Sequence, residues 1–222
     1  EIILLKKIVK EIETLKPKKN KHMIYKDYQN KKLLLTRTEN FYDHNSKMRN
    51  FLTKKKIIDL LSNLIGSKPS LFKDKINWKY PGAIGFEPHQ DAQVWENLYK
   101  NVKSFISLTI SIDKTTIKNG CLEIVRKKHK MGLLGDNKSA IPKSIVEKLK
   151  WEKILTKPGD LIIFDSFVIH ESVKSQLNDN LKLNIQFIAN DANEVNFKNK
   201  YYSLKRKFDG IRKKQIENNA QK

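Results

Sequence analysis

The sequence has little cysteine and no long apolar run. Cys121 is the single cysteine among 222 residues, so no disulfide can form within the chain. This is typical of a reducing compartment, and we predict a cytoplasmic location. No run of 18 apolar residues occurs, so we expect no membrane span. The chain opens directly on EIILLKKIVKE, without Met or a signal-peptide pattern, which is typical of a fragment and leaves targeting unread.

Acidic residues are also few, with 24 Asp and Glu against 45 Lys and Arg, a net charge of +21. A basic surface attracts phosphate backbones and small anions. Lys, Asn and Ile are nevertheless abundant along the whole chain, and the basic residues form no single block. The charge therefore indicates a solvated basic surface more than a polyanion-binding site.

The length favours one domain over residues 1–222, because two halves would each be of marginal size. In EIILLKKIVKEIE and MRNFLTKKKIIDLLSNLIG, apolar residues recur every three or four positions, and Gly66 follows the second segment in the C-terminal cap position. We therefore predict a helical N-terminal part over residues 1–65.

A different pattern begins after Gly66. Short runs such as FISLTISI, CLEIV and KLNIQFIAN are rich in β-branched and aromatic residues and alternate with turn signals such as KNG and KPGD. They predict an antiparallel sandwich or barrel over residues 66–190, with one helical insert at PKSIVEKLKW. The basic segment 191–222 is expected to form a helix or tail packed over the sheet.

Three residues suggest a metal site. His89 and Asp91 in GFEPHQDAQVW are two apart, and such residues face the same side of a strand. His170 ends the apolar run GDLIIFDSFVIH, which we read as one strand. A His-x-Asp pair with a distant histidine is the ligand pattern of the facial triad that binds Fe(II) and leaves three positions open. From these residues alone, a polar turn and a buried structural histidine explain the pattern equally well, since His-x-Asp is short and common.

Four landmarks in the same order resemble the phytanoyl-CoA dioxygenase family of Fe(II)/2-oxoglutarate oxygenases: NWKYPG, HQDA, NGCLEIVRKKHKMGLL and KPGDLIIFDSFVIHES. The resemblance covers about residues 40–190. It implies a mainly β fold with flanking helices, a double-stranded β-helix or cupin-like jelly-roll barrel. It also implies His89, Asp91 and His170 as metal ligands, with no further catalytic residue. Fe(II), 2-oxoglutarate and O2 are the implied cofactors and co-substrates, with ascorbate as an activator in vitro.

The resemblance also implies residues that hold 2-oxoglutarate. The family places a basic residue, usually arginine, after the distal histidine, and a one-residue insertion in VKSQLNDN puts Lys182 there. A lysine lacks the bidentate fork of arginine and holds a carboxylate less rigidly. Ser172 matches a position that donates a hydroxyl to the same carboxylate, and Lys79 a basic residue that reaches co-substrate or substrate. Trp95 is expected either to line the substrate pocket or to pack in the core.

This chain departs from the family at Lys127 and Lys128, which replace a Gly-Ser pair, and we expect the following His129 to be structural. The implied reaction couples the oxidative decarboxylation of 2-oxoglutarate with hydroxylation of a small polar metabolite, such as a phosphonate or another anion. The sequence leaves open the substrate, desaturation as the outcome, and the oligomeric state.

Two alternative functions stay open. A nucleic-acid-directed oxidative dealkylase would use the same triad, but the sequence has no aromatic-and-basic cluster for a flipped base, so we expect no nucleic-acid partner. A catalytically inactive β-barrel binding protein is the other alternative, and lysine at position 182 favours it.

Overall fold

A computed structural model describes residues 1–16, 18, 21–29, 32–94, 105–134, 141–176, 182–190 and 197–220. Its helices are α1 (Ile2–Glu13), α2 (Ser46–Leu52), α3 (Lys55–Ile65), α4 (Lys143–Val146) and α5 (Phe197–Ala220), with 3-10 turns η1 (Tyr42–His44), η2 (Asp91–Val94) and η4 (His129–Met131). Its strands are β1 (Met23–Gln29), β2 (Lys32–Glu39), β3 (Ser70–Lys79), β4 (Phe86–His89), β5 (Phe105–Ser111), β6 (Leu122–Ile124), β7 (Glu152–Ile154), β8 (Leu161–Asp165), β9 (His170–Ser172) and β10 (Lys182–Asn190).

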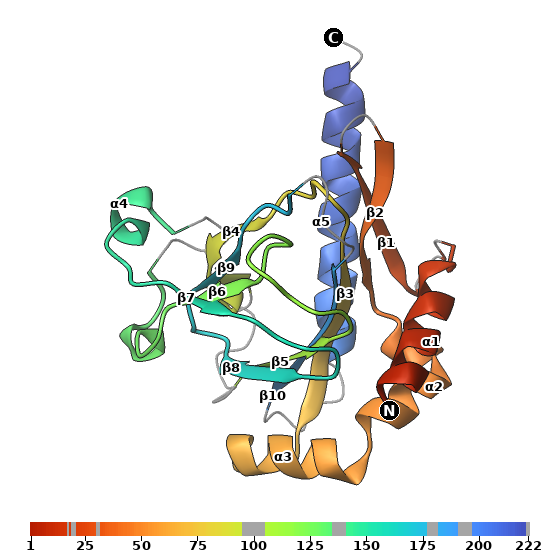
Figure 1. Ribbon diagram of the computed structural model, residues 1–222. Coiled ribbons are helices and arrows are strands. Elements are labelled where there is room, and N and C mark those ends of the chain that lie inside the picture. Colours follow the sequence, from red (N-terminus) through yellow and green to blue (C-terminus); the bar gives the residue numbers. More distant parts are fainter. Residues whose placement is uncertain are drawn as a thin grey trace.

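The strands form two antiparallel sheets that face each other in the centre of the molecule (Figure 1). The larger sheet has the order β1-β2-β3-β10-β5-β8, and the smaller one β4-β9-β6-β7. Because strands distant in sequence are neighbours, as β3 and β10 are, the chain crosses repeatedly between the two sheets. This mainly β architecture with flanking helices confirms the predicted jelly-roll fold class.

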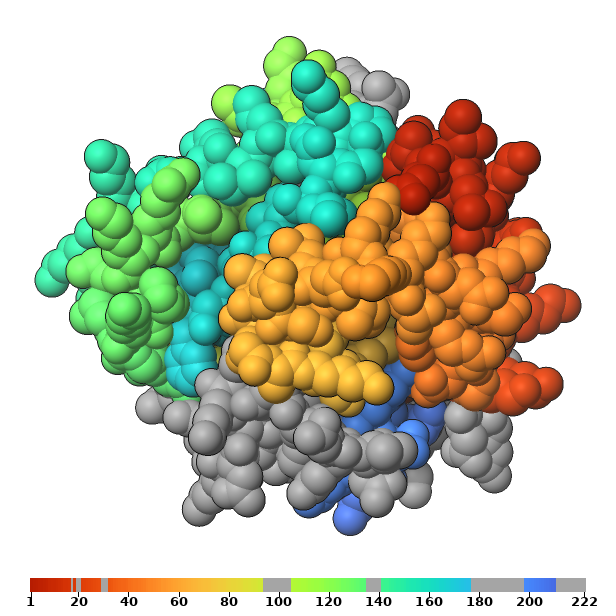
Figure 2. All heavy atoms as spheres, turned by 90° about the horizontal axis from the view of Figure 1, so that it is seen from below, coloured from red at the N-terminus to blue at the C-terminus, as the bar shows by residue number. Residues whose placement is uncertain are grey.

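Helices cover the outer face of the larger sheet. The periodic apolar residues of α1 and α3, among them Leu5 and Leu61, pack into one core with Ile76 of β3 and Leu108 of β5. Seen from below, α1 to α3 form one continuous surface in red and orange (Figure 2). Gly66 ends α3 with a φ of 78°, as its cap position predicted. Since side chains alternate along a strand, the opposite face of β3 and β5 points into the space between the sheets.

The N-terminal part, predicted as helical, also contains two strands between residues 23 and 39, which the sequence did not predict. There β1 and β2 pair along their whole length, and β2 extends the larger sheet by pairing with β3, with Arg37 opposite Asn77. Both segments contain β-branched and aromatic residues in MIYKDYQ and KLLLTRTE, but the charged residues between them obscure a two-residue period. Pairing with the edge of β3 decides the structure here, because local preference is weak.

The C-terminal segment forms a helix against the sheet, as predicted. In Figure 1, α5 stands beside β1 and β2, and its Tyr202 is buried. The fully buried Glu39 of β2 forms ion pairs with Arg37 (2.8 Å) and with Lys205 of α5 (3.1 Å). Burial alone would raise the pKa of Glu39, but Lys73, Arg37 and Lys205 lower it to about 2. Within the described part of the chain, no helix combines the length and apolarity needed to cross a membrane.

Candidate metal centre

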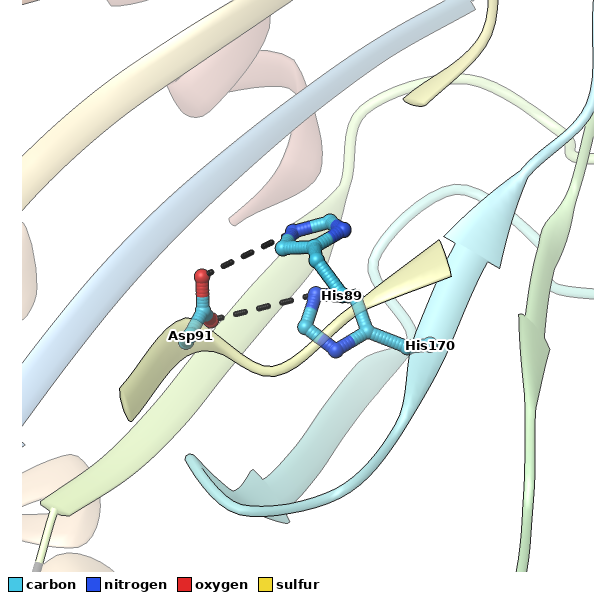
Figure 3. A group of neighbouring side chains, drawn as sticks. All are labelled: His89, Asp91 and His170. Carbon is cyan, nitrogen blue, oxygen red and sulfur yellow. Dashed lines mark ion pairs between the residues drawn. The ribbon is translucent and has the colours of Figure 1, made fainter. Parts of the chain in front are cut away.

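Three potential ligands converge where the smaller sheet meets η2 (Figure 3). His89 ends β4, His170 begins β9, and the two residues are direct partners across these antiparallel strands. Asp91 opens η2, with carboxylate oxygens 4.0 Å from His89 Nε2 and 3.9 Å from His170 Nε2. One ligand atom from each side chain lies within 4.8 Å of the others, so a single ion can contact all three.

The local geometry of these ligands differs from the sequence prediction in two respects. Asp91 does not share a strand with His89, since β4 ends at His89 and the chain turns into η2. The apolar run before His170 is not one strand either. It ends as β8 at Asp165, whose side-chain Oδ1 accepts a hydrogen bond from the backbone N–H of Phe167 (2.8 Å). This Asx-turn directs the chain from the larger sheet into β9 of the smaller one.

Both histidines present Nε2 as the ligand atom. Nδ1 of His89 lies 2.7 Å from the carbonyl oxygen of Glu87, and Nδ1 of His170 lies 2.9 Å from that of Val168. A carbonyl oxygen only accepts hydrogen bonds, so each Nδ1 carries a proton, and in the neutral ring this tautomer leaves the lone pair on Nε2. Burial, assisted by the neighbouring His170, lowers the pKa of His89 to about 3, which keeps its imidazole neutral.

The carboxylate of Asp91 is buried and held in place. Its side chain is 6% exposed, and Ser107 of β5 donates a hydrogen bond from Oγ to Asp91 Oδ2 (2.8 Å). Burial alone would raise the pKa of Asp91, but His170, Lys75 and His89 hold it well below its usual range. Two imidazoles and one ionised carboxylate form the donor set that suits Fe(II) in a facial triad, so the residues fit that ion.

A cavity of about 1330 Å³ adjoins two of the three candidate ligands. His89 and His170 line it, together with Lys75 and Asn77 of β3 and Phe164 of β8. The cavity exceeds the roughly 300–1,000 Å³ of ordinary ligand pockets, which leaves room for two small molecules. Burial lowers the pKa of Lys75 to about 7, and repulsion from the buried Lys73 on the same strand contributes to this shift.

Two of the three residues predicted to hold 2-oxoglutarate meet in the cavity wall. Lys79 donates from Nζ to Ser172 Oγ (3.3 Å) and to the carbonyl oxygens of Gly120 (3.2 Å) and Val173. Gly120 has a φ of 73°, and a Cβ there would lie 2.3 Å from the backbone carbonyl oxygen of Val173, so this position requires glycine. Lys182 is opposite Lys79 in the pairing of β10 with β3, where the structure describes its backbone alone.

The remaining predictions fall outside the metal group. Trp95 lies outside the described residues. His129 belongs to η4 and is not part of the His/Asp group found in the described chain. Sequence reasoning did not identify Ser107, although polar residues alternate with apolar ones in FISLTIS and mark a polar face. It also missed Lys75, which lines the cavity, and Gln90, whose buried side chain bonds to segments distant in sequence.

Comparisons with known proteins identify a family and similar relatives. The phytanoyl-CoA dioxygenase (PhyH) family model matches residues 5–176. A 2-aminoethylphosphonate dioxygenase from the uncultured bacterium HF130_AEPn_1 is 37% identical over 140 residues, 63% of this chain and 53% of that protein. A methylphosphonate hydroxylase from Gimesia maris is 33% identical over 172 residues, 77% of this chain and 64% of that protein. The chain thus spans less than two thirds of the length of either relative.

Solved structures share the fold at low sequence identity. EctD from S. alaskensis, crystallised with 2-oxoglutarate and 5-hydroxyectoine, has a TM-score of 0.71 at 16% identity, covering 85% of this chain and 67% of that one. The non-heme α-ketoglutarate-dependent carbocyclase SnoK has a TM-score of 0.71 at 12% identity, covering 86% and 75%. Because the family match extends over well more than half of its residues, the chain belongs to the phytanoyl-CoA dioxygenase family.

Proposed function

We propose that this protein is an Fe(II)- and 2-oxoglutarate-dependent dioxygenase that hydroxylates a small anionic metabolite. The observation that carries the proposal is the convergence of two imidazoles and one ionised carboxylate beside a cavity large enough for two small molecules. Family membership and the relatives named for oxidation of phosphonates support the same reaction class.

In this proposal His89, Asp91 and His170 hold the ion on one side and leave its cavity side open to ligands. When bound, Fe(II) supplies O2 activation, in which 2-oxoglutarate, O2 and R–H become succinate, CO2 and R–OH. The protonated Nδ1 atoms keep both imidazoles in the ligating tautomer. The buried carboxylate of Asp91 stays ionised, so it neutralises part of the metal charge and no proton competes with the metal for it.

We assign the far carboxylate of 2-oxoglutarate to the corner of the cavity formed by Lys79, Ser172 and the start of β10. Lys79 and Ser172 are already in contact there, and Lys182 is next to Lys79 in the strand register. A lysine ammonium and a hydroxyl both donate hydrogen bonds that a carboxylate accepts.

The substrate class that we propose is a phosphonate or a similar small anion. Lys75 lines the cavity, and with a pKa of about 7 it is partly protonated at neutral pH, so an anionic group would find a cationic partner there. The relatives at 37% and 33% identity are named for 2-aminoethylphosphonate and methylphosphonate. 2-Aminoethylphosphonate carries an aminomethyl group in place of one methyl hydrogen of methylphosphonate, which makes the two compounds a useful pair for comparison.

The test is succinate release by protein supplied with Fe(II), 2-oxoglutarate and ascorbate, with and without each phosphonate. We expect at least one phosphonate to stimulate succinate release and to yield a hydroxylated product by mass spectrometry. His170→Ala should abolish this turnover, because it removes one of three ligands. His129→Ala is the matched control, since that histidine lies outside the metal group, and it should retain turnover.

Two outcomes would contradict the proposal. Retained turnover in His170→Ala would remove this histidine from the metal centre. If the Fe(II)-loaded protein releases no succinate with any of the phosphonates, carboxylates or amino acids offered, the protein is instead a barrel that binds ligands without catalysis.

A further inference from the structure

Gln90, the residue between two of the ligands, faces away from the cavity and is completely buried. Its side-chain Nε2 donates to the carbonyl oxygens of Gly132 (2.9 Å) and Phe167 (2.8 Å), and its Oε1 accepts from the backbone N–H of Leu134 (2.8 Å). Two donor hydrogens and one acceptor oxygen are thus each engaged. A primary amide of this length is therefore matched to three backbone groups at once.

The partners of Gln90 belong to segments far away in sequence, and one of them leads directly to the third ligand. Phe167 precedes Val168, whose carbonyl oxygen accepts the hydrogen bond from His170 Nδ1. A second link between the same segments is the hydrogen bond from the backbone N–H of Ala92 to the carbonyl oxygen of Ser166 (3.0 Å). The hydrogen bonds therefore run from the His89–Asp91 segment to the group that orients His170.

We propose that Gln90 is a positioning residue of the metal centre. It holds the segment that carries His89 and Asp91 at a fixed separation from the turn that precedes His170. Gln90 does not line the cavity, so it acts through the ligands and not on the substrate. The inference rests on the proposed function, because it requires that the three ligands bind a metal ion.

The chemistry of the amide predicts which substitutions matter. Gln90→Glu keeps the length and an acceptor for Leu134, but it places carboxylate oxygens against the carbonyl oxygens of Gly132 and Phe167. Gln90→Met keeps a similar volume and loses all three hydrogen bonds. Gln90→Asn keeps the amide on a side chain shorter by one methylene, so we expect the mildest effect from it.

The experiment measures Co(II) affinity by titration calorimetry for wild type and the three Gln90 variants. Co(II) serves as an air-stable probe of the same ligands. We expect Gln90→Glu and Gln90→Met to weaken binding by about 10- to 100-fold, the range found when partners of metal ligands are removed. We also expect the visible absorption of the bound Co(II) to change at saturation, which a loss of stability alone would not cause.

Leu61→Ala is the control, because Leu61 is buried in the core face of α3 and does not line the cavity. It should lower the melting temperature without changing Co(II) affinity or spectrum. Any Gln90 variant that circular dichroism shows to be unfolded is excluded, and Gln90→Asn then carries the comparison.

The outcomes separate the two proposals. Wild-type affinity and an unaltered spectrum in the folded Gln90 variants would overturn the positioning role. Failure of the wild-type protein to bind Co(II) or Fe(II) would instead overturn the metal centre itself.

Discussion

Replacing Ser107 with alanine removes a hydroxyl that holds the Asp91 carboxylate. Ser107 is completely buried on β5 and donates to Asp91 Oδ2 over 2.8 Å. A hydrogen bond to a charged group contributes about 1.5–3 kcal/mol. At about 1.4 kcal/mol for each factor of ten, its loss corresponds to roughly 10- to 100-fold weaker metal binding. The carboxylate would gain freedom to rotate away from the two imidazoles, which is the physical reason for the loss.

The assay is Co(II) or anaerobic Fe(II) titration calorimetry on Ser107→Ala, with two comparison variants. Ser107→Thr keeps a hydroxyl on a β-branched residue suited to a strand and should recover most of the affinity. Ser166→Ala is the matched control, because Ser166 is also completely buried and its Oγ has no hydrogen-bond partner among the described residues. Equal affinities for the Ser107→Ala and Ser166→Ala variants would refute the role assigned to Ser107.

Further predictions concern the co-substrate, one backbone position and the acid stability. Lys182→Ala should raise the KM for 2-oxoglutarate about tenfold or more through loss of a charge-assisted hydrogen bond, and an unchanged KM in succinate assays would move this role to Lys79. Lys127 has a φ of 62°, so Lys127→Gly should stabilise the fold by about 1 kcal/mol in urea unfolding. Lys128, with a φ of −100°, is the control, and glycine there should destabilise. The pKa of Glu39 is about 2 in the fold, below its ordinary 4.5, so its stabilising effect is complete above pH 4.5 and is lost as the pH falls toward 2. Glu39→Gln should lack this part of the acid dependence, and identical pH profiles would contradict the ion network.

The grouping of His89, Asp91 and His170 and the fold class were predictable because both follow from patterns that are local or ordered along the chain. Each of these patterns can be recognised within one segment of the sequence: the His-x-Asp pair, the distal histidine, and the β-rich runs separated by turn signals. The helix end at Gly66 was readable for the same reason, since a left-handed cap needs only one residue.

The errors have a common physical cause. Residues 23–39 carry weak β preference and many charges, and they become strands because β3 offers an edge to pair with. The run before His170 reads as continuous because its turn depends on one Asp165 side chain that bonds back to the chain. In both cases a single tertiary or turn contact overrides the secondary structure that the composition of the segment indicates.

The metal centre itself combines local and non-local control. Each histidine donates from Nδ1 to the carbonyl oxygen two residues earlier, Glu87 for His89 and Val168 for His170, so each short segment sets the ligating tautomer of its own histidine. The distances between the ligands are set by the pairing of β4 with β9 and by hydrogen bonds from Gln90, which join segments more than 40 residues apart. A motif can therefore identify which atoms are candidates to bind a metal, whereas how tightly they would bind it depends on residues that the motif does not single out. This is why variants at Gln90 and Ser107 test the site more sharply than removal of another ligand.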